Sequence, residues 1–183
     1  MKRSQSRFYY AARNAVNTDL GYFDMRILVI SDTHGEVDKA RDVIESSGKI
    51  DLVIHLGDYF RDAQKLEEFF PDIPFEYIYG NSDFMIGDTP SEKLLEYKGK
   101  RIFITHGHKY SVKWDYEKLY GKAKDMKADI LLFGHTHVAD IIEREGYTIV
   151  NPGSISDSRD GEGESYAIID LDDKKIKPEI VYV

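Results

Sequence analysis

Histidine is the residue whose positions in this chain say most about possible chemistry. The sequence has six histidines, and five of them fall in three short segments: Ser31-Asp32-Thr33-His34, Thr105-His106-Gly107-His108 and Gly134-His135-Thr136-His137. Two more polar segments, Leu56-Gly57-Asp58 and Tyr79-Gly80-Asn81-Ser82-Asp83, also follow strand-like apolar runs. These loops offer imidazole, carboxylate and amide groups at the tips of parallel strands, where ligands bind in open α/β sheets. The pattern predicts a metal site at the carboxyl edge of a sheet, with metal-assisted hydrolysis as its chemistry.

The elements that carry these loops belong to one small domain, because a chain of 183 residues is of single-domain length and can bury a sizeable core. The sequence contains no cysteine, so imidazole nitrogen and oxygen must supply every metal ligand. Such ligands favour Mn, Fe, Ni, Zn or Mg. The lack of cysteine fits a reducing compartment, and we expect a cytoplasmic protein. No apolar run approaches the length of a membrane span, so we expect no membrane partner.

The charge of the chain argues against long nucleic acid as a partner. The formal net charge is −8 and the isoelectric point is near 5.3, whereas a duplex-binding surface needs clustered lysine and arginine. A small phosphate ester is still compatible with this charge, because bound divalent ions would reverse the local field at the site.

Residues 1–24 differ from the rest of the chain. Lys2, Arg3, Arg7 and Arg13 precede the first acidic residue, Asp19. The segment lacks the apolar centre of a secretory signal and has only a faint likeness to a transit peptide. We interpret it as an N-terminal extension or the product of an upstream start, and we expect the domain to comprise residues 25–183.

From residue 25 the apolar pattern alternates between strand and helix. The predicted elements are a strand at 27–30, a helix from 37 that Gly48 stops, a strand at 52–56, a helix that Pro71 ends, and a strand at 75–79. This β-α-β-α-β order implies parallel strands with right-handed crossovers.

The second half of the chain has more strand than helix. A hairpin is predicted around Lys98-Gly99-Lys100, then a helix at 116–126, a strand at 130–133 and four short strands at 138–143, 147–150, 166–171 and 176–183. An α/β half followed by a mainly antiparallel half predicts two mixed sheets packed face to face with helices outside.

The order of the polar segments resembles the signature of the calcineurin-like metallophosphoesterases. The matching residues are Asp32-x-His34, Gly57-Asp58, Gly80-Asn81-x-Asp83, His106 and Gly134-His135-x-His137. The compact size, Thr105-His106-Gly107-His108 and Asn151-Pro152-Gly153-Ser154 look like the small prokaryotic phosphodiesterase branch. The likeness covers the chain from Met25 to its end and implies a four-layer αββα sandwich.

The resemblance also implies a site with two divalent metal ions, with Mn²⁺ preferred and Ni²⁺, Fe²⁺, Zn²⁺ or Mg²⁺ as alternatives. Carried over by position, the first ion would be held by Asp32, His34, Asp58 and His137. The second would be held by Asn81, His106 and His135, with Asp58 bridging the two ions. The predicted catalytic residues are Asp58, Asn81 and His108.

The chemistry of these residues supports that reading. A shared carboxylate keeps two dications roughly 3.5–4 Å apart, and a hydroxide between them is a nucleophile at neutral pH that needs no covalent enzyme intermediate. We expect His135 and His137 to leave one extended strand end on the same side, because side chains alternate with period two. Gly57, Gly80 and Gly134 would permit tight turns without a Cβ near the ions.

One position departs from the family pattern. Many members have histidine between the asparagine and the acidic residue, as a proton donor to the leaving oxygen, but this chain has Ser82. A serine hydroxyl is far too weak an acid to replace imidazole near neutral pH. The small-phosphodiesterase branch is similar in having non-histidine residues there.

Other polar residues have structural alternatives. His55 lies inside a predicted strand, so we expect a hydrogen-bonded histidine of the core or sheet face rather than a ligand. His108 has two equal readings, a contact to phosphate or a partner that orients a ligand. Asp83 is expected to orient His106 or another ligand, and residues 151–154 are expected to form a turn.

Two classes of function are compatible with the sequence: a metal-dependent phosphodiesterase and a non-catalytic scaffold resembling the retromer subunit of the same fold. The retromer subunit has lost histidine ligands, whereas this chain keeps every position, which favours an enzyme acting on a small phosphate-ester substrate. Within enzymes, a phosphomonoesterase or a nucleotide-polyphosphate hydrolase is the alternative. A homo-oligomer is left open.

Overall fold

The computed structural model describes residues 23–183. The predicted extension, residues 1–24, lies outside the described residues except for its last two, so the proposed domain boundary stays a prediction. The first half of the chain forms β1 (Met25–Ile30), α1 (Val37–Ser46), β2 (Leu52–His55), α2 (Phe60–Phe69) and β3 (Phe75–Tyr77). The second half forms β4 (Glu92–Tyr97), β5 (Lys100–Thr105), the 3-10 helix η1 (His108–Tyr110), α3 (Glu117–Met126), β6 (Ile130–Leu132), β7 (Ala139–Arg144), β8 (Tyr147–Pro152), β9 (Ser165–Leu171) and β10 (Ile176–Tyr182).

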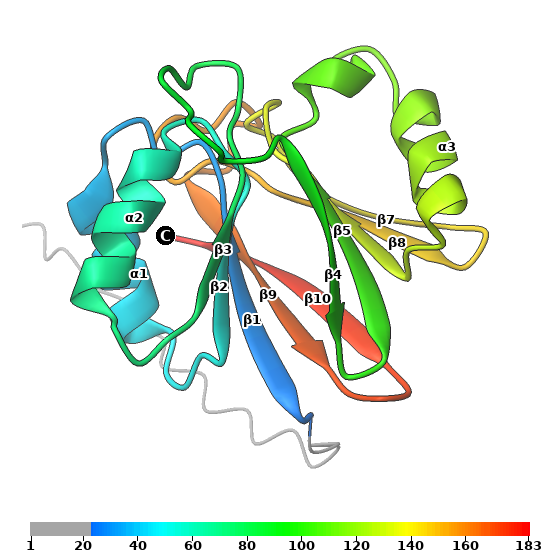
Figure 1. Cartoon of the computed structure of the whole chain (residues 1–183), viewed down its shortest axis with the longest axis horizontal. Helices are drawn as coiled ribbons and strands as arrows, with labels where there is room; N and C mark the ends of the chain where they lie inside the picture. Colours follow the sequence, from blue (N-terminus) through cyan, green and yellow to red (C-terminus); the bar gives the residue numbers. More distant parts are fainter. Residues whose placement is uncertain (1–22) are drawn as a thin grey trace, which may run out of the picture.

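The strands form two mixed sheets of five strands each. The first has the order β10-β9-β1-β2-β3, and the second has the order β4-β5-β6-β8-β7. In the first sheet β1, β2 and β3 are parallel, as the sequence predicts, and β9 pairs antiparallel with β1. The carboxyl ends of β1, β2 and β5 point to the upper end of the molecule in Figure 1, and β6 runs parallel to β5. The polar loops that follow these strands therefore gather at one end.

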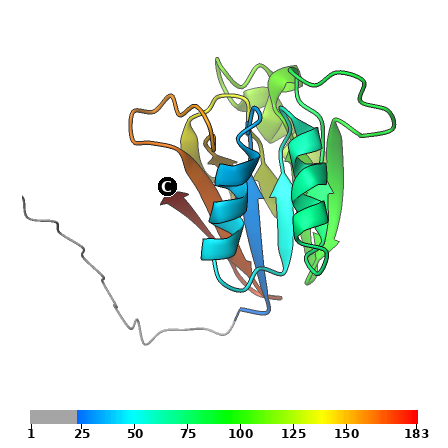
Figure 2. The same ribbon diagram turned by 90° about the vertical axis from the view of Figure 1, so that its left-hand side faces the viewer.

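Three apolar clusters hold the layers together. The first fills the space between the sheets, with Ile27 and Ile54 from one sheet and Ile104 and Leu132 from the other. The second lies between the first sheet and the helices α1 and α2, which lie side by side over that sheet in Figure 2. The third lies between the second sheet and α3. The order helix, sheet, sheet, helix confirms the predicted αββα sandwich.

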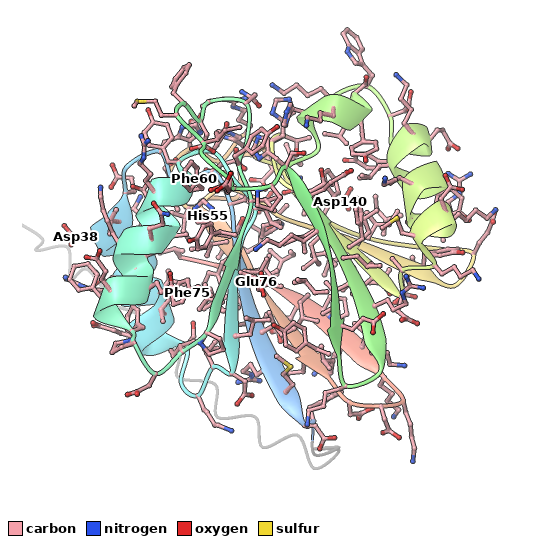
Figure 3. The ribbon with its side chains drawn as sticks, viewed as in Figure 1. Asp38, His55, Phe60, Phe75, Glu76 and Asp140 are labelled. Carbon is pink, nitrogen blue, oxygen red and sulfur yellow. The ribbon has the colours of Figure 1, made fainter. Side chains whose placement is uncertain are left out.

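An ion pair joins the two sheets at one side. The ammonium group of Lys93 on β4 donates to Glu76 on β3 at 2.7 Å, and both are edge strands of their sheets. Figure 3 shows Glu76 between the ribbons of β3 and β4. Both side chains are partly buried, which makes the pair less screened by salt than a surface pair.

The second half of the chain is less antiparallel than the sequence pattern indicates. The predicted hairpin is present, with Lys98 and Gly99 both in the left-handed region at φ 51° and 70°. However, β5, β6 and β8 are mutually parallel. The expected turn at residues 151–154 is also wrong in part, because Asn151 and Pro152 belong to β8.

Candidate metal centre

The polar loops after five strands converge at the upper end of the sandwich, and two groups of donor atoms form there. The first group is Asp32, His34 and His137, whose potential ligand atoms all lie within 4.8 Å of one another. Nε2 of His137 is 3.2 Å from Oδ1 of Asp32, and Nε2 of His34 is 4.0 Å from the same oxygen. The loops after β1 and β6 thus bring one carboxylate and two imidazole rings together.

The second group contains Asp32, Asp58 and His106, whose potential ligand atoms also lie within 4.8 Å of one another, and Asn81 lies beside it. Nε2 of His106 lies 3.4 Å from Oδ1 of Asp58 and 3.2 Å from Oδ1 of Asn81. The ring of His135 lies beside that of His106, with centroids 5.1 Å apart. Nδ1 of His106 donates to the carbonyl oxygen of Leu56 at 2.8 Å, which leaves Nε2 free of a proton when the ring is neutral.

Asp58 lies between the two groups. Its Oδ1 faces His106, while its Oδ2 is 3.9 Å from Nε2 of His34. Asp58 is buried, at 3% exposure, so contacts within the protein rather than with water fix the orientation of its carboxylate. One carboxylate is therefore placed to serve both donor groups.

The hydrogen bonds of Asp32 provide a test of whether a cation fits. Oδ2 of this fully buried residue accepts from the hydroxyl group of Ser31 at 2.5 Å and from the backbone N–H of His135 at 3.1 Å. Among the described residues, Oδ1 of Asp32 and Nε2 of His34 have no hydrogen-bond partner although both atoms are buried. A buried carboxylate oxygen without a partner is costly, and a divalent cation is the partner that the surrounding imidazole nitrogens also require. The donor set fits metal ions.

The backbone at the ligand positions is strained. Asp32, His34 and Asp58 have φ angles of 54°, 46° and 52°, and His135 and His137 have φ angles of 71° and 60°. Such left-handed conformations of non-glycine residues are uncommon and concentrate at functional sites. The expectation that His135 and His137 leave an extended strand end is therefore wrong: β6 ends at Leu132, and the bent loop sends one ring toward His106 and the other toward Asp32.

Two glycines leave room for the carboxylates, as expected from the sequence. A Cβ built on Gly80 would lie 2.2 Å from Oδ1 of Asp58. One on Gly134 would lie 2.0 Å from the hydroxyl oxygen of Ser31 and 2.8 Å from Oδ2 of Asp32. Any side chain at either position would displace a carboxylate of the centre or its hydrogen-bond donor.

The electrostatics of the centre keep His135 and Asp58 in ligand-competent forms, whereas hydrogen bonds and charge from Asp58 and Asp32 outweigh burial and raise the pKa values of His106 and His137. Burial and the positive neighbours His106 and Lys113 lower the pKa of His135 to about 4, so this ring is neutral at pH 7. Burial alone would raise the pKa of Asp58, but the hydrogen bond and charge of His106 and two donors from Ser82 hold it well below its ordinary value. Neutral imidazole and ionised carboxylate are the forms that bind metal.

Ser82 contacts the carboxylate that lies between the groups. Its backbone N–H donates to Oδ1 of Asp58 at 2.8 Å, and its hydroxyl group donates to Oδ2 at 2.9 Å. The hydroxyl proton is thus directed at Asp58. This contact is not visible in the sequence pattern, which identifies the position only by its missing histidine.

Asp83 was expected to orient His106 or another ligand, and the structure shows no contact to His106 but bonds to the loops that carry Asp58 and Asn81. Its carboxylate accepts from the backbone N–H groups of Tyr59 at 2.8 Å, Phe60 at 3.0 Å and Gly80 at 2.8 Å. Asp83 therefore joins the loop after β2 to the loop after β3 and caps the start of α2. His106 is oriented by a backbone carbonyl group instead.

His108 lies at the edge of the centre. Its ring centroid is 5.4 Å from that of His106 and 6.2 Å from that of His135. The ring is partly exposed, and among the described residues its buried Nδ1 has no hydrogen-bond partner. The structure shows no bond from His108 to another proposed ligand, so the reading as a contact to phosphate is the one that gains support.

His55 is a buried, hydrogen-bonded histidine, as the sequence predicts. It is fully buried, and burial lowers its pKa to about 4. Asn151 was missed as a contributor to the site. Its side-chain amide donates to the carbonyl oxygen of Gly134 at 3.1 Å and to the hydroxyl group of Thr136 at 2.8 Å, which fixes the loop that carries His135 and His137.

Comparison with known proteins agrees with this centre. The family model of the calcineurin-like phosphoesterase superfamily domain matches residues 25–174. The Bacillus subtilis protein named "Probable metallophosphoesterase YsnB" is 36% identical over 150 residues, which are 81% of this chain and 85% of that protein. "Phosphodiesterase YfcE" of Escherichia coli strain K12 is 28% identical over 172 residues, 81% of this chain and 89% of that protein.

Solved structures give the same result for the fold. A Streptococcus pneumoniae protein described as a predicted phosphoesterase has a TM-score of 0.74 at 31% identity, covering 86% of this chain and 89% of that one. Vps29 of Entamoeba histolytica complexed with Zn²⁺ has a TM-score of 0.64 at 22% identity, covering 86% and 98% of the two chains. The latter likeness concerns the fold alone.

The chain belongs to the calcineurin-like phosphoesterase superfamily. Its relatives are named metallophosphoesterases and phosphodiesterases, and the protein is a metal-dependent hydrolase of phosphoric esters. Among residues 23–183, none of the helices combines the length and apolar character needed to cross a membrane.

Proposed function

We propose that the protein is a dinuclear metal-dependent phosphodiesterase that hydrolyses small phosphate diesters. The observation that carries the proposal is the position of Asp58, whose two carboxylate oxygens face different donor groups, one containing His106 and the other His34. With a single metal ion, one of these two groups of potential ligands would have no ion to bind.

In this proposal the first ion is held by Asp32, His34, Asp58 and His137, and the second by Asp58, Asn81, His106 and His135. Two bound dications, with Mn²⁺ preferred, would supply a water nucleophile of lowered pKa and would neutralise charge on the phosphoryl oxygens. The partly exposed ring of His108, beside His106 and His135, would donate to a phosphoryl oxygen. Ser82 holds Asp58 in position through its N–H and hydroxyl group.

A diester rather than a monoester is proposed for two reasons. YfcE, which aligns with most of the chain, is named a phosphodiesterase. In addition, Ser82 directs its hydroxyl proton at Asp58, so the position that supplies an acid in many relatives supplies none here. The proposed substrate is a small ester, because the net charge of −8 opposes binding of long nucleic acid.

The scaffold alternative is disfavoured by the completeness of the centre. The fold is shared with Vps29, but fold alone does not define function. Here the oxygen of Asp32 that accepts no hydrogen bond, the strained ligand backbones and the cleared space at Gly80 and Gly134 all concern metal ligands. A protein that served only as a scaffold would have no need of a buried carboxylate oxygen without a hydrogen bond or of strained backbone at these positions.

The test is Asp58→Asn, which removes the charge shared by both groups while keeping the shape of the side chain. We expect it to bind fewer than two Mn²⁺ ions and to lose nearly all hydrolysis of bis(p-nitrophenyl) phosphate. Metal content by mass spectrometry and turnover measure the two effects. Asp173→Asn, an exposed change in the turn after β9 at the opposite end of the sheet, is the matched control. Two ions and full turnover in Asp58→Asn would refute the dinuclear assignment.

A further inference from the structure

Behind the metal centre, on the side of the first sheet that α2 covers, lie three buried polar side chains that are not among the proposed ligands. They are Thr33, His55 and Asp62, with exposures of 0%, 0% and 2%. Figure 3 shows His55 between α2 and the strands of this sheet. Buried polar side chains are generally hydrogen-bonded. Their hydrogen-bond partners therefore show which segments of the backbone they fix in place.

The three residues form one hydrogen-bonded chain with a defined direction. The backbone N–H of Gly57 donates to Nδ1 of His55 at 3.2 Å, so the neutral ring carries its proton on Nε2. Nε2 lies 3.1 Å from the hydroxyl oxygen of Thr33, which accepts that proton's hydrogen bond. The Thr33 hydroxyl group in turn donates to Oδ2 of Asp62 at 2.8 Å. All three hydrogen bonds of this chain therefore run in one direction, from the backbone of Gly57 to the carboxylate of Asp62.

Asp62 accepts a second hydrogen bond from the loop that contains Thr33. Its Oδ2 also accepts from the backbone N–H of Gly35 at 2.8 Å. Thr33 and Gly35 flank His34 in sequence, and Gly57 directly precedes Asp58. The carboxylate of Asp62, carried by the rigid helix α2, is therefore fastened to both sides of one proposed ligand and, through His55, to the turn that carries another.

These hydrogen bonds hold segments of the backbone that are strained. Asp32, His34 and Asp58 all have left-handed φ angles, a conformation that persists only when surrounding contacts over-determine it. The loop 32–35 has α2 on one side, through Asp62, and the ends of β1 and β2 on the other. The network supplies the contacts that hold the loop in the ligand-binding conformation before any ion arrives.

We propose that Asp62 is a positioning residue that, acting through Thr33 and His55, preorganises the loop 32–35 and the turn at Asp58 and thereby sets the affinity of the centre for divalent metal. Asp62 touches neither metal nor substrate in this role. The inference rests on the proposed function, since it presupposes that Asp32, His34 and Asp58 are ligands.

The test compares two substitutions at one position in the full chain. Thr33→Val keeps the shape of the side chain but removes the hydroxyl group that joins His55 to Asp62, whereas Thr33→Ser keeps a hydroxyl group. Isothermal titration of metal-free protein with Mn²⁺ measures the dissociation constant. We expect Thr33→Val to weaken binding by about 10- to 100-fold, as loss of an outer-shell partner does, and Thr33→Ser to bind with nearly the parent affinity. Asp62→Asn should behave like Thr33→Val.

Two further measurements separate positioning from general stability. At saturating Mn²⁺, the kcat of Thr33→Val should return close to the parent value, because the ligands themselves are intact. Leu171→Ala, which removes core packing at the end of the sheet remote from the centre, should lower the melting temperature without changing the dissociation constant. This variant shows how much the melting temperature can fall through lost packing alone while the affinity for Mn²⁺ stays unchanged.

The outcomes are distinct. If Thr33→Val and Asp62→Asn lowered the melting temperature but bound Mn²⁺ with the parent affinity, the network would be a packing feature and the proposal would be overturned. If one variant failed to fold, the other would decide the matter. A parent chain that bound no Mn²⁺ would instead overturn the proposed function, and the role of Asp62 with it.

Discussion

Ser82 occupies the position at which many members of the family have histidine, and its hydroxyl group is engaged with Asp58. A hydroxyl group so placed stabilises the carboxylate but cannot protonate a departing alkoxide, because its own acidity is far too low near neutral pH. The remaining imidazole near the centre that is not a proposed ligand and not fully buried is that of His108. The centre therefore either uses His108 as its general acid or has no imidazole acid.

Turnover should depend strongly on the leaving group. Without an imidazole acid the leaving oxygen departs largely as an anion, so rates on aryl phosphodiesters should fall steeply as the pKa of the released phenol rises. Ser82→His should flatten this dependence and improve alkyl diesters by up to roughly 10²–10⁴-fold, the range of general acid catalysis. The slope for a series of substituted phenyl diesters is the measurement.

His108→Ala is the companion variant. If His108 only contacts a phosphoryl oxygen, its loss should lower all rates while leaving the slope unchanged. A parent slope that is shallow and becomes steep in His108→Ala would assign the acid to His108 and contradict the interpretation that the centre lacks one.

At the residue scale, the sequence predicts the proposed ligands but not what supports them. Ligand identities follow from motifs of fixed spacing, and the structure brings all of them to one place. Asp62, Asn151 and the hydroxyl group of Thr33 could not be identified, because each acts through a hydrogen bond to a segment distant in sequence. Nothing in the types of these residues separates them from ordinary turn and helix residues.

The elements that carry the centre are short strands followed at once by tight loops, and glycine determines how closely those loops approach. Gly134→Ala would force a Cβ to within 2.0 Å of the buried hydroxyl oxygen of Ser31, which itself donates to Asp32. We expect a loss of stability of about 1–3 kcal/mol from overpacking and weaker Mn²⁺ binding. Chemical denaturation and metal titration measure these effects.

Gly121→Ala is the matched control for this prediction. Gly121 lies exposed inside α3, where an added Cβ would meet no described atom within 4 Å. Alanine there should stabilise the protein by about 0.5–1 kcal/mol, because glycine is the poorer helix former. Destabilisation by Gly134→Ala together with stabilisation by Gly121→Ala would show a local clash at Gly134. An unchanged stability in Gly134→Ala would contradict it.

Element types were largely predictable, and their partners less so. The hairpin around Gly99 and the β-α-β-α-β start follow from local pattern and turn chemistry, which is why both are confirmed. The parallel run of β5, β6 and β8 was not predicted, because the apolar pattern of a strand does not specify its neighbour or its direction. The left-handed bend at His135 and His137 was also missed, since it is imposed by contacts with Asp32 and Asn151 rather than by local preference.

The whole molecule should be largely independent of its first residues. Asp24 still belongs to the sandwich, because its backbone N–H donates to the carbonyl oxygen of Leu171 at 3.1 Å. Deleting residues 1–22 should therefore change the melting temperature and turnover little. Thermal unfolding and hydrolysis of bis(p-nitrophenyl) phosphate check this. A large loss of either would mean that the segment packs on the domain or takes part in an interface.

The pairing of β9 with β1 has a consequence for folding during synthesis on the ribosome. β1 lies inside its sheet, with β2 on one side and β9 on the other, and Met25 pairs with Leu171. A nascent chain on the ribosome that has been extended only to residue 164 already contains all the proposed ligands, yet the apolar strand β1 still has a bare edge. The sheet that carries the centre is therefore complete only once residues 165–182 have emerged, and until then its open edge favours association with other chains over metal binding.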